Sequence, residues 1–250
     1  MNPFGVSALA FLCIFGSAIA GIIVRDRLPD HHLSEDSQKI IKAARNVVSG
    51  LAALTLGLII ATAKQSFDGK EAALKDGAAK MIVLNRLLLK EGGASEKARA
   101  ALRHVAQKGV EIIEKTGKDG LDPEKVNGQA IDAFMTQLLA LPEQNASQTW
   151  IRNASLSLGN EITVTIWKIY QSAARTVSPL FLSVLVFWLM TIFFSLGLIS
   201  PLNMSVLSAL FTAAISMTGA ILLTLELDQP YGGMIQMTTE PLKMAIRQFR

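Results

Sequence analysis

Four long apolar stretches constrain this chain more than any other feature of its sequence. They cover residues 3–24, 47–63, 178–196 and 202–225, and none of them contains Lys, Arg, Asp, Glu or His. A helix needs about 20 mostly apolar residues to cross the hydrocarbon core of a bilayer, within a range of about 17 to 25. A helix at the surface of a soluble protein would carry charges on its wet side. The sequence therefore predicts an all-α membrane protein with four transmembrane helices embedded in a lipid bilayer.

Most of the charged residues lie between the second and third stretches. Segment 64–177 holds 16 of the 24 Lys and Arg residues and 13 of the 20 Asp and Glu residues, a net charge of +3. Its apolar residues recur at helical spacing, first in continuation of the second span as far as Gly92 and then in three further stripes. These stripes are Ala98, Leu102, Val105, Gly109 and Ile112; Val126, Ala130, Phe134, Leu138 and Leu141, in a helix opened by Asp122 and Pro123; and Ile151, Leu158, Ile162, Ile169 and Ala173.

This pattern predicts an extramembrane helical bundle inserted between spans two and three. The expected domains are a first transmembrane hairpin over 1–63, the bundle over 64–177, a second transmembrane hairpin over 178–225 and a C-terminal tail over 226–250. Lys and Arg residues favour the cytoplasmic side of a membrane. Because the loop between spans one and two holds only 5 of them and residues 200–203 hold none, we expect both termini and the bundle to be cytoplasmic.

Catalytic and metal sites find little support in the sequence. His31 and His32 lie far along the chain from His104, and no cysteines or paired carboxylates stand near them at the spacing of metal ligands. No glycine-rich phosphate loop follows a strand, and no serine lies in a nucleophile-elbow pattern. Aromatic residues do not alternate with the basic ones as in a single-strand nucleic-acid binder. We therefore expect no enzyme activity, no cofactor, no metal and no nucleic-acid partner.

Small and polar residues form two stripes within the spans. The second span repeats small residues every four positions, at Ser49, Ala53, Gly57 and Ala61, and the fourth carries hydroxyls at Ser205, Ser208, Thr212 and Ser216. Small residues let membrane helices approach closely, and hydroxyls can bond between helices or back to their own helix. Each stripe is therefore either a helix-packing face or one wall of a pore. Ser17 and Gly21 in the first span, and Gly16 and Ala20, repeat the small-residue pattern.

Two acids at the end of the fourth span form a further candidate site. Glu226 and Asp228 lie at a predicted helix C-terminus, where a carboxylate opposes the macrodipole at about 0.3–1 kcal/mol each. We expect Lys64, Lys168 or Arg175 to pair with one of them at the membrane boundary. The alternative is an ordinary helix stop that faces water.

Three segments resemble a known family. Residues 54–68 read Leu-Thr-Leu-Gly-Leu-Ile-Ile-Ala-Thr-Ala-Lys-Gln-Ser-Phe-Asp, and residues 83–88 read Val-Leu-Asn-Arg-Leu-Leu. Both resemble the bacterial membrane proteins known as bestrophin-like, and Glu-Leu-Asp-Gln-Pro-Tyr-Gly-Gly at 226–233 is similar to their closing motif. The resemblance implies a location in the bacterial inner membrane. True bestrophins are pentameric anion channels with four spans and a helical cytoplasmic region, so it also implies a homo-oligomer, such as a pentamer. Their second membrane helix carries an aromatic constriction, whereas residues 47–63 contain no aromatic residue, and no pore residue is transferred to this chain.

Two functions from different classes follow. The first is an oligomeric, bestrophin-like ion channel that conducts small anions. The channel would be oligomeric because the four helices of one subunit are too few to form an evident pore, whereas several symmetry-related subunits could surround one. The second is a membrane-anchored helical scaffold or sensor that recruits a cytosolic partner. A secondary transporter ranks third, because the sequence shows neither an inverted repeat nor an interrupted span.

Overall fold

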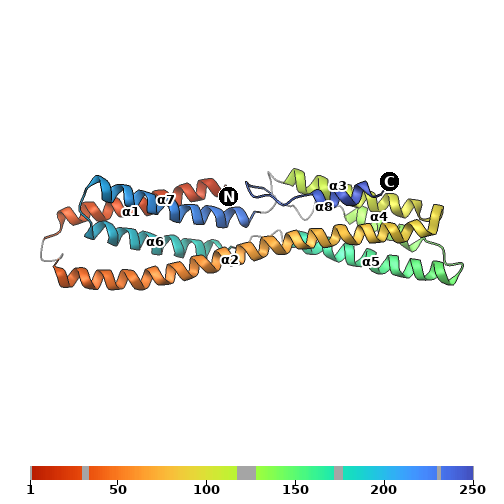
Figure 1. Cartoon of the computed structure of the whole chain (residues 1–250), viewed down its shortest axis with the longest axis horizontal. Coiled ribbons are helices and arrows are strands. Elements are labelled where there is room, and N and C mark those ends of the chain that lie inside the picture. The colour runs from red at the N-terminus through yellow and green to blue at the C-terminus, as the bar shows by residue number, and fades with distance from the viewer. Residues whose placement is uncertain (1, 30–33, 117–127, 172–176, 230–231, 250) are drawn as a thin grey trace. The chain divides into compact units, whose positions relative to one another are not determined.

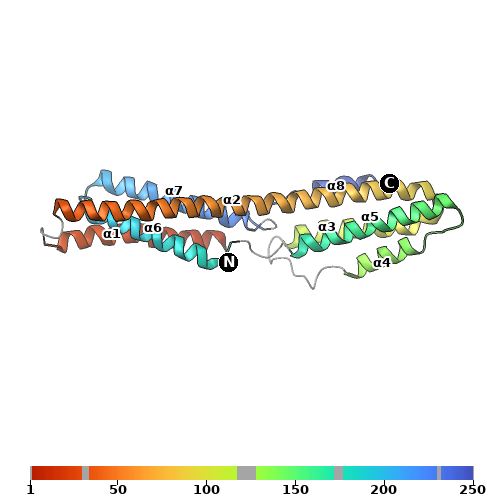
Figure 2. The ribbon, with the colours of Figure 1, turned by 90° about the horizontal axis from the view of Figure 1, so that it is seen from below.

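The computed structural model describes residues 2–29, 34–116, 128–171, 177–229 and 232–249. In these ranges the chain is helical and contains no strand. Figure 1 shows the helices along the chain, and Figure 2 shows them turned by 90°. Four helical stretches are long and apolar enough to cross a membrane: Pro3–Arg27, Glu35–Lys115, Pro179–Ile199 and Met204–Leu227. The predicted all-α class with four candidate spans is confirmed.

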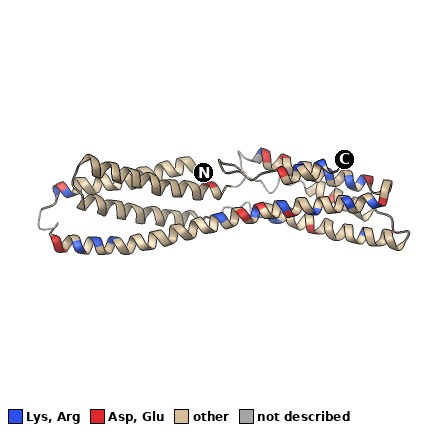
Figure 3. Cartoon of the chain, viewed as in Figure 1, with Lys and Arg blue, Asp and Glu red and all other residues tan. Residues whose placement is uncertain are grey.

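The chain divides into two compact units. The first comprises Met1–Ser66 and Thr176–Asp228, and the second comprises Phe67–Arg175 and Gln229–Arg250. The uncharged parts of α1, α6 and α7 stand out in Figure 3, where charged residues gather at the start of α2 and in the second unit. We call the two units the membrane unit and the bundle unit.

The membrane unit contains α1 (Pro3–Arg27), the first part of α2 (Glu35–Leu88), α6 (Pro179–Ile199) and α7 (Met204–Leu227). Local signals in the sequence set the helix ends. Asn2 caps α1 by accepting from the Phe4 amide at 3.1 Å, and Asn203 caps α7 by accepting from the Val206 amide at 2.8 Å. Pro179 occupies the first turn of α6, where its missing N–H costs no helical hydrogen bond. The α1 helix packs against both α6 and α7.

The bundle unit contains the rest of α2, then α3 (Glu96–Thr116), α4 (Gly128–Leu139), α5 (Ala146–Gln171) and α8 (Glu240–Arg247). The helix of the second span does continue past Lys64, and it ends at Leu88 in a 3-10 turn, η2 (Leu89–Ser95). Gly92 has a φ of 62° in this turn, a conformation that glycine adopts at little cost. The Ser95 hydroxyl closes the turn by donating to the Leu88 carbonyl at 2.6 Å.

The predicted apolar stripes of the bundle are largely buried. Side chains are less than 9% exposed at Ala98, Leu102 and Val105 in α3, at Ala130, Phe134 and Leu138 in α4, and at Ile151 and Ile162 in α5, and Ile169 of α5 is 9% exposed. Leu158 is only half-buried. Asp122, Pro123, Val126 and Ala173 lie outside the described residues.

The C-terminal tail contains a helix that the sequence pattern did not predict. Leu242 and Ala245 of α8 are buried, and α8 packs against α3. Lys243 pairs with Glu114 of α3 at 2.7 Å, and the Thr239 hydroxyl donates to the same carboxylate at 3.1 Å. Residues 229–250 therefore belong to the bundle unit.

Candidate pore and helix-packing faces

A close helix contact in the membrane unit joins α1 to α6 through two glycines. A Cβ atom built on Gly21 would lie within 3.0 Å of the Leu198 amide nitrogen and would also collide with the Phe194 carbonyl. A Cβ atom on Gly197 would collide with the Ala18 carbonyl. Only glycine fits at either position, because backbone atoms rather than flexible side chains fill the space. The approach of two backbones is the packing mode expected of small residues in membranes.

Ser17 strengthens this α1–α6 contact. Its hydroxyl lies 3.0 Å from the Met190 carbonyl of α6 and 2.7 Å from the Ile14 carbonyl of its own helix. Ser17 and Gly21, predicted as a small-residue repeat, therefore lie at a packing interface, whereas Gly16 and Ala20 are exposed.

Most of the small-residue stripe of α2 is exposed in the membrane unit. Ser49 is half-buried, whereas Ala53, Gly57 and Ala61 are exposed, and no atom would lie within 4 Å of a Cβ built on Gly57. In the membrane unit α2 instead buries Ala52, Ile59 and Ala63, which lie roughly a third of a turn around the helix at 3.6 residues per turn. The stripe is therefore available to lipid, to a second subunit or to water.

The hydroxyl stripe of α7 is exposed as well. Ser208, Thr212 and Ser216 each donate to a carbonyl of the preceding turn, at 3.0, 2.9 and 2.9 Å, and Ser205 begins the same exposed row. The packed side of α7 is the opposite one, formed by Leu210, Ala214, Thr218 and Ile221. Because these hydroxyl protons are already donated, the stripe presents mainly acceptor oxygens to its surroundings.

The two acids at the end of α7 are buried. Glu226 is 3% exposed and Asp228 is 5% exposed, so they do not form a water-facing helix stop. Asp228 accepts a hydrogen bond from the Val177 amide at 3.2 Å, which joins the end of α7 to the segment that enters α6. Lys64 and Lys168 are exposed, and Arg175 lies outside the described residues. The predicted pairing of one of these three with an acid stays a prediction.

A buried amide in the bundle unit has a role that the sequence pattern did not reveal. Asn85 of α2 is 1% exposed. It donates to the Gln248 carbonyl at 3.1 Å and accepts from the Arg99 guanidinium of α3 at 3.0 Å. It therefore joins α2, α3 and the C-terminal segment. The available signal was an amide placed directly after the buried Leu84 on an apolar helix face.

In the described ranges no group of three or more His, Cys, Asp or Glu residues is arranged to hold an ion. His104 is exposed on α3, and His31 and His32 lie outside those ranges.

Comparison with known proteins decides the family. The family model for the bestrophin-like domain matches residues 10–242 of the sequence, which is most of the chain. The chain belongs to the bestrophin-like family. No curated protein matches it, so the remaining evidence is structural.

Crystal structures of a bacterial bestrophin homologue from Klebsiella pneumoniae share the fold of this bestrophin-like chain. Two of them, each carrying one substitution, match with TM-scores of 0.65 and 0.68 at 12% sequence identity. The first match covers 97% of both chains, and the second covers 100% of this chain and 97% of the homologue. The resemblance inferred from residues 54–68, 83–88 and 226–233 is thus confirmed at the level of family and fold.

Proposed function

We propose that this bestrophin-like protein is a homo-oligomeric ion channel of the bacterial inner membrane, with small anions as the conducted species. The observation that carries the proposal is the stripe at Ser49, Ala53, Gly57 and Ala61 of α2, in which the last three residues are exposed. A row of small residues that is left mostly exposed by its own subunit is suited to line a narrow conduit between subunits. The exposed hydroxyl stripe of α7 offers a second polar surface for the same purpose.

Charge and family support the choice of anions. The segment 64–177 carries a net charge of +3 per subunit, and a ring of subunits would multiply this into a positive vestibule that attracts anions. Bestrophins, which this chain resembles in layout, are pentameric anion channels. A pentamer with both termini and the bundle in the cytoplasm is the arrangement we propose.

Stoichiometry and current test the proposal separately. Native mass spectrometry of the detergent-solubilised chain should give a ring-sized mass, and the purified protein should carry anion currents in planar bilayers. A monomer without current in repeated reconstitutions would contradict the channel.

A substitution at Gly57 tests the role of the α2 stripe. Gly57→Leu adds a large side chain to the stripe at a position where a Cβ would have no atom of its own subunit within 4 Å, so we expect an assembled oligomer with current reduced at least tenfold. Gly16→Leu is the matched control, because Gly16 of α1 is exposed, belongs to neither candidate pore stripe, and a Cβ built there would also have no atom within 4 Å. Full current in Gly57→Leu would show that the stripe does not line the pore. Loss of the oligomer in that variant alone would show that the stripe is a packing face.

Exposed apolar side chains of α5 favour the second candidate, a scaffold that recruits a cytosolic partner. Trp150, Val164 and Trp167 of α5 are 62%, 43% and 41% exposed. Exposed aromatic residues of this kind are enriched at protein interfaces. A stoichiometric partner lost in a Trp150→Ala, Trp167→Ala variant, together with an electrically silent protein, would favour the scaffold over the channel.

A further inference from the structure

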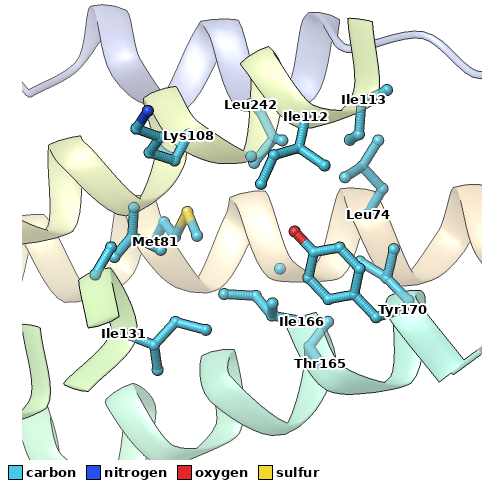
Figure 4. A pocket seen from close by; sticks show the side chains of 16 residues that line it. Leu74, Met81, Lys108, Ile112, Ile113, Ile131, Thr165, Ile166, Tyr170 and Leu242 are labelled. Carbon is cyan, nitrogen blue, oxygen red and sulfur yellow. The ribbon is translucent and has the colours of Figure 1, made fainter. Parts of the chain in front are cut away.

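The bundle unit contains a partly open apolar cavity that the proposed channel function does not use. The cavity has a volume of about 60 Å³ and is bounded by residues of α2, α3, α4, α5 and α8. Figure 4 shows its walls, with Leu74 and Met81 from α2, Ile112 and Ile113 from α3, and Leu242 from α8. The α8 helix closes one side, because Leu242 lies in the wall and the Glu114–Lys243 ion pair holds this helix to α3.

The walls are almost entirely hydrocarbon. Lys108 contributes its aliphatic stem, while its ammonium is paired with Glu111 at 2.9 Å. Thr165 turns its methyl group toward Gly77. The described wall therefore offers no charged group to a molecule bound in the cavity.

Among the described wall residues, Tyr170 turns a polar group toward the cavity. The Tyr170 hydroxyl points into it in Figure 4, and within the described part of the chain this hydroxyl forms no hydrogen bond. Burial raises the pKa of Tyr170, so at neutral pH the phenol keeps its proton and can donate one hydrogen bond. A hydroxyl in this position is suited to a ligand with a single hydrogen-bond acceptor.

Size and chemistry together define the occupant. A cavity needs about 10–15 Å³ to hold one water, and a stable water needs two to four polar partners. This cavity is several times larger than that minimum, yet its described wall offers one evident polar partner. Water molecules in it would therefore lack most of the hydrogen bonds that they need. A carboxylate or an ammonium would be buried without an opposite charge, which is strongly unfavourable. We propose that the cavity is a binding site for a small, neutral, mostly apolar molecule with one oxygen that meets the Tyr170 hydroxyl.

The site lies on the helix that carries the candidate pore stripe. Leu74, Gly77 and Met81 of the cavity wall belong to α2, as do Gly57 and Ala61. The binding site does not depend on the proposed channel function, and the test below measures binding alone.

Photolabelling of the full-length protein in lipid nanodiscs tests the proposal. The probe is an octanol that carries a diazirine on its chain, and crosslinked residues are mapped by mass spectrometry. We expect labels on Met81, Ile112 or Leu242. Tyr170→Phe should weaken this labelling about two- to tenfold, the effect of one hydrogen bond. The corresponding diazirine octanoic acid should label these residues at least tenfold less at pH 7.

Filling the cavity provides the decisive variant. A Cβ on Gly109 would lie in ordinary contact with Leu242, 3.5 Å from its Cδ1 atom, so Gly109→Leu should occupy the cavity and abolish the labels. Gly69→Leu is the control, because Gly69 belongs to the same unit and a Cβ built on it would have no atom within 4 Å. Gly109→Ala provides a milder variant should Gly109→Leu lose its far-UV circular dichroism, and it should reduce labelling at least twofold.

Three results would overturn the proposal. The first is labelling confined to α1, α6 and α7, which would mean that the probe only partitions into lipid. The second is labelling of the cavity wall that persists in both Gly109 variants. The third is equal labelling by the alcohol and the acid, which would contradict the neutral class of ligand.

Discussion

The α1–α6 crossing gives the sharpest stability prediction. Gly21→Ala places a methyl group against the Phe194 carbonyl and the Leu198 amide nitrogen, atoms that no rotamer change can move. The two helices must separate, and overpacking of a well-packed interface costs typically about 1–3 kcal/mol. Separation also lengthens the bond from Ser17 to the Met190 carbonyl, and interhelical hydrogen bonds in membranes contribute on average about 0.6 kcal/mol.

The higher helix propensity of alanine stabilises the variant and so opposes the steric cost, and a control variant is needed to correct for it. Alanine is favoured over glycine inside a helix by about 1 kcal/mol. Gly57→Ala makes the same chemical change in α2, where no atom would lie within 4 Å of the new Cβ. The difference between the two variants isolates the steric cost, so Gly21→Ala should be less stable than Gly57→Ala by about 1–3 kcal/mol.

The measurement is equilibrium unfolding in mixed micelles of mild detergent and dodecyl sulfate, followed by far-UV circular dichroism. Gly197→Ala should behave like Gly21→Ala, because its Cβ meets the Ala18 carbonyl from the other side of the same contact. Equal free energies of unfolding for Gly21→Ala and Gly57→Ala would refute the close approach of the two backbones.

Two further predictions concern the bundle unit. Asn85→Leu removes the hydrogen bonds to Arg99 and to the Gln248 carbonyl, and leaving buried polar groups unsatisfied costs about 1–3 kcal/mol. Limited proteolysis should therefore cut the C-terminal segment of the variant faster than that of the parent protein. An unchanged cleavage rate would contradict the role of Asn85. Lys115 and Lys108 hold the pKa of the Glu111 carboxyl at about 2, below its usual 4.5. A carboxyl with a lowered pKa stabilises the folded state above its unfolded pKa, so this contribution is lost as pH falls from about 5 to about 2. Glu111→Gln should remove that part of the acid dependence in a pH titration of thermal stability, and identical profiles for the two proteins would argue against the pair.

The sequence alone determined the class of the protein and most of its helices. Uncharged stretches of about 17 to 24 residues can be solvated only by lipid or a large core, so the four candidate spans followed from composition. The stripes at Ala98, Leu102 and Val105 and at Ala130, Phe134 and Leu138 were recognised because water on one side of a bundle helix forces a polar face there. The expected ends of the spans came from where the apolar residues stop, and the structure added the capping by Asn203 and the first-turn position of Pro179.

Only the tertiary structure decided which faces of the membrane helices pack. Lipid and a neighbouring helix are equally apolar, so hydropathy cannot distinguish the side of α1 that contacts α6 from the side that contacts lipid. The small-residue pattern is the same at Gly21 and Gly57, yet a partner backbone covers the first and no atom of the subunit covers the second. Glu226 and Asp228 are buried although the sequence allowed a water-facing helix end, and the cavity beside Tyr170 forms because five helices converge on it. These features depend on contacts between residues far apart in the chain, which local pattern and composition do not encode.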